Sequence, residues 1–161
     1  MATGVYPGSF DPFHLGHLAV VEQAARQLDR LVVGVLTNPG KRARLFGAAE
    51  RVALVEASTA HLPNVRCVAF DGLAVDLARR EGADVLVRAA HKEHGTERSM
   101  AAMNVMLSDV QTVFVATDPG SRTISSTVVR ELVARGNLRA AARLVPRPVA
   151  DAILSGQRGT A

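Results

Sequence analysis

The chain has 161 residues, of which 48% are apolar and 21% charged, so it suits one compact domain and excludes a disordered chain. Aromatic residues make up only 4%, which leaves Val, Ala and Leu to fill the core and favours close packing of helices on a sheet. The formal net charge is +4, but the basic residues are spread between apolar positions. That spread argues against a nucleic-acid-binding protein and suits an anionic small substrate.

The single cysteine, Cys67, excludes an internal disulfide and indicates a reducing compartment. It lies in residues 65–70, which we predict to be a buried strand, so we expect an inert core thiol. The N-terminal residues show no signal-peptide pattern, and no apolar stretch is long enough to span a bilayer. We therefore expect a cytoplasmic protein.

Short apolar runs alternate with longer amphipathic ones along the chain. In chain order we expect strand 5–8, helix 15–28, strand 31–36, helix 48–60, strand 65–70, helix 73–81, strand 84–87, helix 96–107, strand 112–116, and helices 125–135, 138–144 and 147–154. This alternation predicts an α/β fold, a Rossmann-like doubly wound sheet of five parallel strands with helices on both faces and extra C-terminal helices. We expect one domain over 1–161, with a loose tail at 155–161, and a ligand at the carboxyl ends of the strands.

The segment between the first strand and the first helix combines turn residues with two histidines. Asp11-Pro12 is a dipeptide that initiates turns. His14 and His17 flank Gly16 at the start of the helix, where free N–H groups and the helix dipole favour an anion. Because glycine permits close approach, the pattern indicates a site for a phosphate or a base, with imidazoles as hydrogen-bonding partners.

Two other interpretations of this histidine pair stay open at this point. The pair could lie in an ordinary turn and face solvent. Histidines three residues apart could also chelate zinc, but the nearest further ligands are His91 and His94, and no cysteine cluster completes the set. We therefore predict no protein-bound metal.

The run Gly8-Ser9-Phe10-Asp11-Pro12, followed by His14-Leu15-Gly16-His17, resembles the signature of the nucleotidylyltransferase superfamily. That superfamily carries a (His or Thr)-x-Gly-His motif after its first strand. The wider segment looks most like the phosphopantetheine adenylyltransferase family, and the resemblance covers about residues 4–155. It implies adenylyl transfer from ATP to 4′-phosphopantetheine, which gives dephospho-coenzyme A and pyrophosphate. It also implies Mg²⁺ carried with ATP and a homohexamer.

A second segment, Ile124 to Arg130, supports the same resemblance because it is similar to the family's Ile-Ser-Ser-(Ser/Thr) motif. Ser125 or Ser126 is a good N-cap, and Thr127 adds a hydroxyl in the first turn. Hydroxyls and free N–H groups at a helix N-terminus can cradle a polyphosphate. An ordinary capped helix is the alternative, and the first segment favours the phosphate cradle.

A third segment, Asn38-Pro39-Gly40-Lys41, follows the second strand and resembles the family's Asn-Pro-x-Lys loop. A basic surface loop is the alternative. The resemblance implies that Lys41 meets the phosphates of both substrates, and its place at the carboxyl end of a strand favours this role.

A fourth segment, Val87-Arg88, matches the first arginine of the family's Arg-Gly-Leu-Arg stretch. The following residues depart from the family between 89 and 99. His91 stands where the family has its second arginine and offers weaker, pH-dependent positive charge. Glu97 is the candidate for the family's acidic residue in this region.

The resemblance therefore implies a set of site residues. The catalytic residues are His17, Lys41 and Arg88. The nucleotide-binding residues are Ser9, Phe10, His14, Gly16, His17, His91, Glu97, Ser125, Ser126 and Thr127. The acceptor-binding residues are Ser9, Lys41, Ala74 and Arg88. Since the acceptor phosphate is already ionised, catalysis needs no general base and depends on positioning and charge stabilisation.

Three alternatives remain for the function. The departures at 89–99 allow a paralogue that uses another phosphorylated acceptor, or CTP in place of ATP. A nucleotide-binding protein without catalysis is a second alternative, which the intact motifs disfavour. Nucleic-acid binding is the third.

Overall fold

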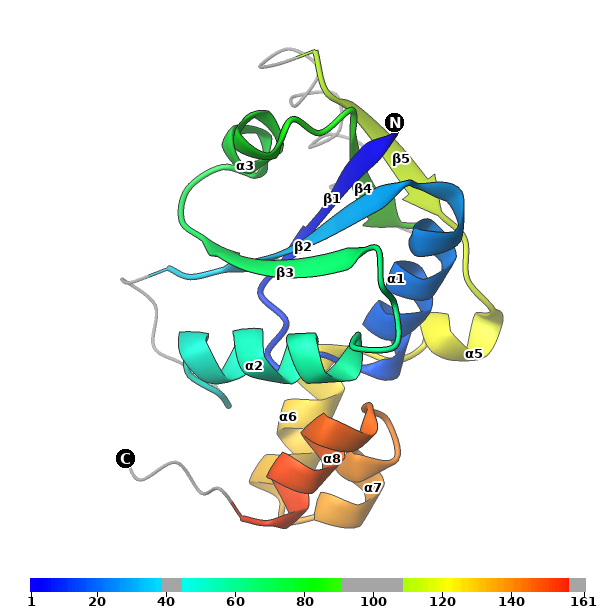
Figure 1. The fold of residues 1–161 in the computed structure, drawn as a ribbon. Helices are drawn as coiled ribbons and strands as arrows, with labels where there is room; N and C mark the ends of the chain where they lie inside the picture. The colour runs from blue at the N-terminus through cyan, green and yellow to red at the C-terminus, as the bar shows by residue number, and fades with distance from the viewer. Residues whose placement is uncertain (39–44, 91–108, 157–161) are drawn as a thin grey trace.

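The computed structural model describes residues 1–38, 45–90 and 109–156 (Figure 1). Its strands are β1 (Thr3–Gly8), β2 (Arg30–Leu36), β3 (Val65–Phe70), β4 (Val85–Ala89) and β5 (Gln111–Val115). Its helices are α1 (Leu15–Gln27), α2 (Ala48–Ser58), α3 (Ala74–Glu81), α5 (Pro119–Arg122), α6 (Ser126–Ala134), α7 (Leu138–Ala142) and α8 (Arg147–Leu154).

The five strands form one sheet in the order β3-β2-β1-β4-β5, and every neighbouring pair is parallel. The prediction of a doubly wound parallel sheet is therefore confirmed, and the strand order is new information. The order reverses between β1 and β4, since the chain first builds outward to β3 and then returns to β4. Such a switch point leaves a crevice at the carboxyl ends of the strands, where ligands bind in open α/β sheets.

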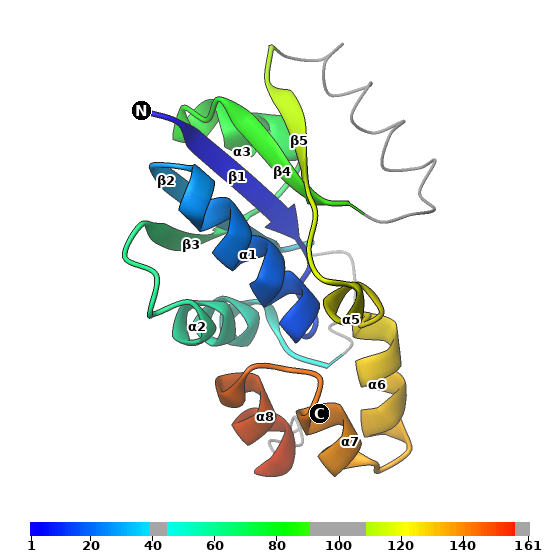
Figure 2. The ribbon, with the colours of Figure 1, turned by 90° about the vertical axis from the view of Figure 1, so that its right-hand side faces the viewer.

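Side chains alternate between the two faces of the sheet and produce two cores. Tyr6 and Val33 lie in the larger core with α1, α2 and the C-terminal helices. Val5 and Val32, their neighbours in sequence, lie in a smaller core with α3. Figures 1 and 2 accordingly show α3 on one side of the sheet and α1 and α2 on the other.

The C-terminal helices lie next to the start of α1 and continue the larger core (Figure 2). The N–H of Leu15, the first residue of α1, donates to the carbonyl of Leu144 at 2.9 Å. This bond satisfies one of the N–H groups that a helix start leaves without an intrahelical acceptor. None of the described helices has both the length and the apolar character that a membrane span requires.

Most predicted elements agree with the structure within two or three residues, but a short helix was missed. Helix α5 comes between β5 and α6; its N-cap Asp118 accepts from the N–H of Ser121, and Pro119 occupies the first turn. The helix predicted at 96–107 lies outside the described residues, as does the predicted tail from residue 157 onward.

The prediction of a buried strand at 65–70 was wrong in one respect, because β3 is an edge strand and only Phe70 is buried there. Cys67 is half-buried rather than a core residue. Burial still raises the pKa of its thiol to about 12, and the charge of Glu56 adds to the rise. The thiol therefore stays protonated at neutral pH, as an inert cysteine requires.

Candidate active site

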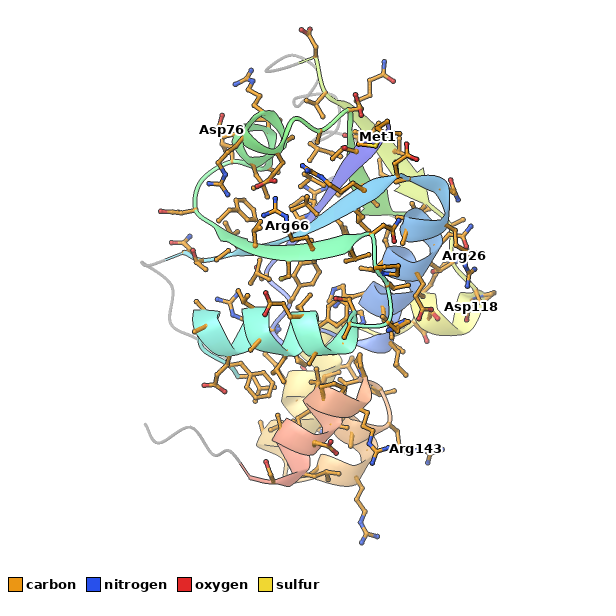
Figure 3. All side chains as sticks on the ribbon, viewed as in Figure 1. Met1, Arg26, Arg66, Asp76, Asp118 and Arg143 are labelled. Atoms are coloured by element: carbon orange, nitrogen blue, oxygen red, sulfur yellow. The ribbon has the colours of Figure 1, made fainter. Side chains whose placement is uncertain are left out.

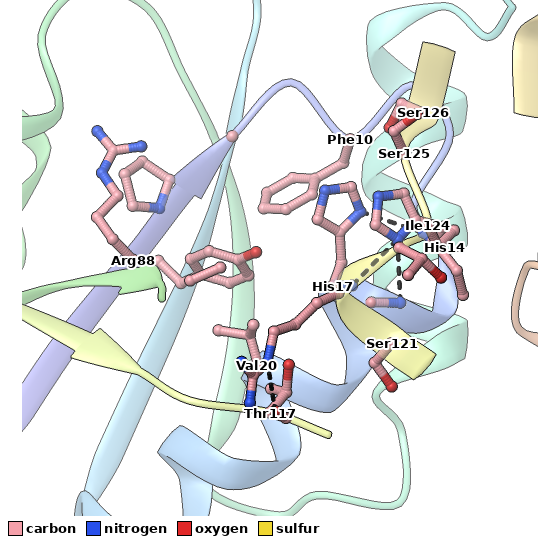
Figure 4. Close-up of a pocket in the computed structure, with 17 residues that line it drawn as sticks. Phe10, His14, His17, Val20, Arg88, Thr117, Ser121, Ile124, Ser125 and Ser126 are labelled. Atoms are coloured by element: carbon pink, nitrogen blue, oxygen red, sulfur yellow. Dashed lines mark hydrogen bonds between the residues drawn. The ribbon is translucent and has the colours of Figure 1, made fainter. Parts of the chain in front are cut away.

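A cavity of about 500 Å³ opens at the switch point of the sheet (Figure 4). Its walls are the carboxyl ends of β1 and β4, the first turn of α1, and the segment from Thr117 to Ser126. The predicted site residues that line it are Phe10, His14, Gly16, His17, Arg88, Ser125 and Ser126. The histidine motif, Arg88 and the serine pair are far apart in the sequence, and all three therefore line the same cavity.

His14 and His17 start α1 by capping each other. The Nδ1 atom of His14 accepts from the N–H groups of Gly16 at 3.0 Å and His17 at 3.2 Å. The Nδ1 atom of His17 accepts from the N–H of His14 at 3.1 Å. This is a capping box in which two imidazoles replace the usual hydroxyl and carboxylate side chains.

The backbone donors determine the tautomer of both rings. A backbone N–H can only donate, so each Nδ1 must present its lone pair. In the neutral ring the proton then lies on Nε2. In each neutral imidazole Nε2 therefore carries the N–H, while Nδ1 secures the helix start.

Aromatic rings fix the orientation of the His17 imidazole. His14 stacks on it with centroids 3.6 Å apart, and Phe13 stacks on it at 5.5 Å. Phe10 meets it edge-on at 4.9 Å. Packing from several directions leaves the His17 ring few rotamers, which is the preorganisation that a catalytic donor needs.

Gly16 is required by the protein's own packing. A Cβ added there would lie 2.7 Å from the carbonyl oxygen of Ser121 and 2.8 Å from Cε1 of His14. The glycine thus lets α1 approach α5 closely. The sequence predicted close approach by a ligand at this position, and the described neighbours are α5 and the capping histidine.

The serine pair begins α6, and both serines line the cavity. Ser125 is the N-cap, and its hydroxyl accepts from the N–H of Val128 at 3.2 Å. The hydroxyl of Ser126 donates to the carbonyl of Pro12 at 3.0 Å, which ties α6 to the β1–α1 loop. Thr127 is exposed and does not line the cavity; its hydroxyl accepts from Arg130.

Asp11, which the sequence indicated only as a turn residue, is a structural centre of the β1–α1 loop. Its buried carboxylate accepts from the N–H groups of Leu45 at 3.1 Å and Phe46 at 2.9 Å, just before α2. Its carbonyl accepts from Nη1 of Arg130 in α6 at 2.7 Å. The adjacent Phe10 adopts a left-handed backbone conformation, with φ of 51°. The β1–α1 loop is thereby held to the segment that leads into α2 and to helix α6.

The described cavity lining carries positive charge and no carboxylate. Arg88 contributes a guanidinium from the end of β4, and Arg122 contributes another from α5. Nε of Arg122 donates to the carbonyl of Thr117 at 2.7 Å. Cations, hydroxyls and two helix N-termini around one hollow suit a polyphosphate anion.

Sequence reasoning missed several lining residues, namely Tyr6, Thr117, Ser121 and Arg122. The position of Thr117 just after β5 was an available signal, because parallel strands end at the same edge of the sheet. Arg122 gave no such signal, since α5 itself was not predicted. Among the described residues, no group of three His, Cys, Asp or Glu side chains could hold a metal ion.

Two of the remaining predicted residues, Ser9 and Ala74, lie outside the cavity. Ser9 is exposed just beyond β1 and does not line the cavity. Ala74 begins α3, half-buried against the smaller core. Lys41, His91 and Glu97 lie outside the described residues, so their roles remain predictions.

The fold and the cavity define the class of protein. A doubly wound sheet whose switch-point cavity is lined by a capped His-x-x-His helix start and by a second helix N-terminus is the arrangement of a nucleotidyltransferase. The model of the cytidylyltransferase-like family matches residues 5–132 of this chain.

Two curated relatives make the assignment more specific. A phosphopantetheine adenylyltransferase of Rhizorhabdus wittichii is 41% identical over 158 residues, covering 96% of this chain and 94% of the relative. A phosphopantetheine adenylyltransferase of Lachnoclostridium phytofermentans is 40% identical over 162 residues, covering 99% and 98%. The chain belongs to the cytidylyltransferase-like family and, within it, to the phosphopantetheine adenylyltransferases.

Solved structures support the fold. A Vibrio parahaemolyticus structure, provisionally described as a nicotinate-nucleotide adenylyltransferase, gives a TM-score of 0.69 at 17% identity and covers 96% of this chain and 99% of its own. A lipopolysaccharide core biosynthesis protein from Thermoplasma volcanium gives 0.52 at 22% identity, covering 73% and 97%.

Proposed function

We propose that this chain transfers the adenylyl group of ATP to 4′-phosphopantetheine and releases dephospho-coenzyme A and pyrophosphate. One observation carries the proposal: His17, Arg88 and the Ser125-Ser126 pair line the same cavity at the switch point. The two relatives, both named for this activity, are 40–41% identical over nearly the whole chain.

In the proposed reaction an oxygen of the acceptor phosphate attacks the α-phosphorus of ATP in line. A new P–O bond forms, the bond to the bridging oxygen breaks, and pyrophosphate leaves with the electron pair. The acceptor phosphate is ionised at neutral pH, so no proton has to be removed. Catalysis then depends on holding two anions together and on stabilising the charge that develops between them.

Different residues of the cavity are proposed to contact different phosphates. Nε2–H of His17 donates to the α-phosphate oxygens as their charge grows, and the neighbouring imidazole of His14 contacts the same triphosphate. The N-terminus of α6, with Ser125 and Ser126, receives the β- and γ-phosphates. Arg88 counters the repulsion between the nucleotide and the acceptor phosphate.

The other predicted contacts complete the proposal. Phe10 and Gly16 shape the nucleotide side, and Thr127, His91 and Glu97 are proposed to bind the nucleotide from outside the described lining. Ser9, Lys41 and Ala74 are proposed to bind the acceptor; Ser9 also binds the nucleotide, and Lys41 meets the phosphates of both substrates. These assignments follow the resemblance of the motifs.

Mg²⁺ is proposed to arrive with ATP as part of the substrate. The described cavity lining offers hydroxyls, imidazoles and guanidinium groups but no carboxylate, so it does not form a magnesium cage of its own. The homohexamer implied by the resemblance and the cytoplasmic location remain predictions, and light scattering would give the oligomeric state.

Pyrophosphate release tests the proposed function. The purified protein is supplied with ATP or CTP and a panel of acceptors: 4′-phosphopantetheine, nicotinate mononucleotide and glycerol 3-phosphate. Release with ATP and 4′-phosphopantetheine alone supports the proposal. Release with a different pair identifies a paralogue, and ATP binding by calorimetry without release from any pair identifies a non-catalytic nucleotide-binding protein.

A further inference from the structure

Phe10 has an unusual backbone conformation for an aromatic residue. Its φ of 51° lies in the left-handed region, and no other non-glycine residue of the described ranges has a positive φ. A residue with a Cβ is crowded in this region, so the conformation is unfavourable for phenylalanine. Such a conformation persists only where the surrounding structure requires it, and residues of this kind cluster at functional sites.

The ring of Phe10 lies over the end of β1, next to Gly8. A Cβ added at Gly8 would lie 2.9 Å from Cζ of this ring and 3.0 Å from Cε1. Gly8 is the last residue of β1 and has no positive φ, so its backbone does not require glycine. The space that the Phe10 ring occupies does require it. Gly8 and Phe10 therefore depend on each other.

The Phe10 ring packs against other aromatic rings at the cavity. It meets the His17 imidazole with centroids 4.9 Å apart and 87° between the planes. Tyr6 meets it at 5.4 Å and Phe13 at 5.5 Å, both in edge-to-face geometry. Phe10 is 3% exposed and belongs to the larger core, whose side chains fill the layer between the sheet and α2 (Figure 3). The ring therefore has little freedom to move away from His17.

The contact with Phe10 restrains a motion of His17 that the cap permits. The cap holds one ring atom of His17, Nδ1, through the backbone N–H of His14 at 3.1 Å. A hydrogen bond tolerates a range of angles, so the imidazole can still tilt about Nδ1. The stacked ring of His14 belongs to the same cap and can shift with it. Phe10 lies outside the cap, and its directional edge-to-face contact favours one tilt.

We infer that Gly8 and Phe10 together position the His17 imidazole: Gly8 leaves room for the Phe10 ring, and the ring sets the direction of Nε2–H. This inference rests on the proposed function, because that function gives His17 its place at the α-phosphate. It adds that Phe10 acts on the reaction through His17, and that Gly8 acts through Phe10.

Steady-state kinetics of Phe10→Leu test the inference. We expect kcat to fall about 10- to 100-fold, since a misplacement of about 1 Å can cost about 10²-fold in rate. The Kd for ATP should stay within about threefold of wild type, because the ring orients the donor and does not hold the nucleotide. A kcat equal to that of wild type would overturn the inference. A loss of ATP affinity as large as the loss of kcat would also overturn it, since Phe10 would then be a nucleotide contact.

The matched control is Phe70→Leu. Phe70 is a buried phenylalanine of the smaller core, and it does not line the cavity. The same atoms are removed from the interior, so we expect a comparable loss of thermal stability with kcat unchanged. A similar fall of kcat in Phe70→Leu would show that a loosened core alone slows the reaction, and it would overturn the inference.

Gly8→Ala tests the same pair of residues from the other side, because it displaces the ring without removing it. We expect kcat to fall while ATP affinity is retained. In the double variant Gly8→Ala/Phe10→Leu the smaller leucine leaves room for the new Cβ, so the loss should be no larger than in Phe10→Leu alone. Two independent losses that multiply in the double variant would overturn the coupling. If Phe10→Leu does not fold, an unchanged kcat in Gly8→Ala would overturn the inference.

A failure of the proposed function gives a different result, because the wild-type protein itself is then inactive with 4′-phosphopantetheine. NMR relaxation of the His17 ring carbons then tests the positioning directly. Greater mobility of this ring in Phe10→Leu, with unchanged hydrogen exchange of the backbone amides in α1, supports the inference. Unchanged mobility of the His17 ring overturns it.

Discussion

The imidazoles of His14 and His17 stack with centroids 3.6 Å apart and 21° between their planes, and each Nδ1 accepts an N–H from the other residue's backbone. One pair of side chains therefore ends the β1–α1 loop, starts α1 and places the proton of each neutral ring on Nε2.

His17→Ala should lose most turnover while it retains ATP binding. Removal of one donor that stabilises a transition state typically costs about 10²- to 10³-fold in kcat. Pyrophosphate release measures turnover, and calorimetry measures ATP affinity. His61→Ala is the control, because His61 is an exposed histidine paired with Glu22 outside the cavity. Near wild-type turnover in His17→Ala would exclude the assigned role.

His14→Ala and His14→Asn should separate capping from nucleotide binding. Loss of the N-cap in His14→Ala is expected to lower the free energy of unfolding by about 0.5–2 kcal/mol. Asparagine is a good N-cap, so His14→Asn should recover most of that stability. Because the amide does not replace Nε2–H, the KM for ATP should stay raised. Urea unfolding and steady-state kinetics give the two values; equal recovery of both would show that His14 acts only as a cap.

Gly16→Ala should be destabilising and should weaken ATP binding. The new Cβ would lie 2.7 Å from the Ser121 carbonyl oxygen, so α5 or the His14 ring must move. Such overpacking typically costs about 1–3 kcal/mol. At Gly47, the N-cap of α2, the nearest atom to a new Cβ is 4.0 Å away, so Gly47→Ala is the control without a clash, with only the cost of a weaker N-cap. Equal melting temperatures for the two variants would contradict this account.

Asp118 should make the stability of α5 depend on pH. Hydrogen bonds from the Ser121 hydroxyl and then from its backbone N–H hold the pKa of the Asp118 carboxyl below its ordinary value. A lowered pKa means that the stabilisation is present above the unfolded pKa and is lost as pH falls through the folded value. Asp118→Ala should therefore be less stable than wild type at pH 7. The free energies of unfolding of the two proteins should converge at low pH. A difference that persists under acid would argue against this cause.

Cys67 should react slowly with alkylating agents in the folded protein. With a pKa of about 12 its thiolate fraction at pH 8 is far smaller than in the unfolded chain. A difference of about three pKa units from an ordinary thiol predicts roughly 10³-fold slower modification. Mass spectrometry with iodoacetamide, with and without urea, measures the ratio. Fast modification under native conditions would show that the thiol is more accessible than the structure implies.

The apolar period of each segment determined most of the fold. The helix over 147–154 and the strand over 65–70 were predicted with their observed bounds. Helix starts and strand runs depend on residues within a few positions of each other, and the sequence contains that information directly. The motif residues His14, His17, Ser125 and Ser126 were likewise identified before the structure placed them around one cavity.

The tertiary structure decided what depends on distant partners. Asp11 meets Phe46 across 35 positions and Arg130 across 119, and Arg51 reaches Ser9 across 42. The edge position of β3, which leaves Cys67 half-buried, follows from a strand order that local patterns do not encode. The sequence by itself thus determined the elements and the chemical groups. Only the folded chain decided which groups share the cavity, because that depends on long-range hydrogen bonds and on the packing order of the strands.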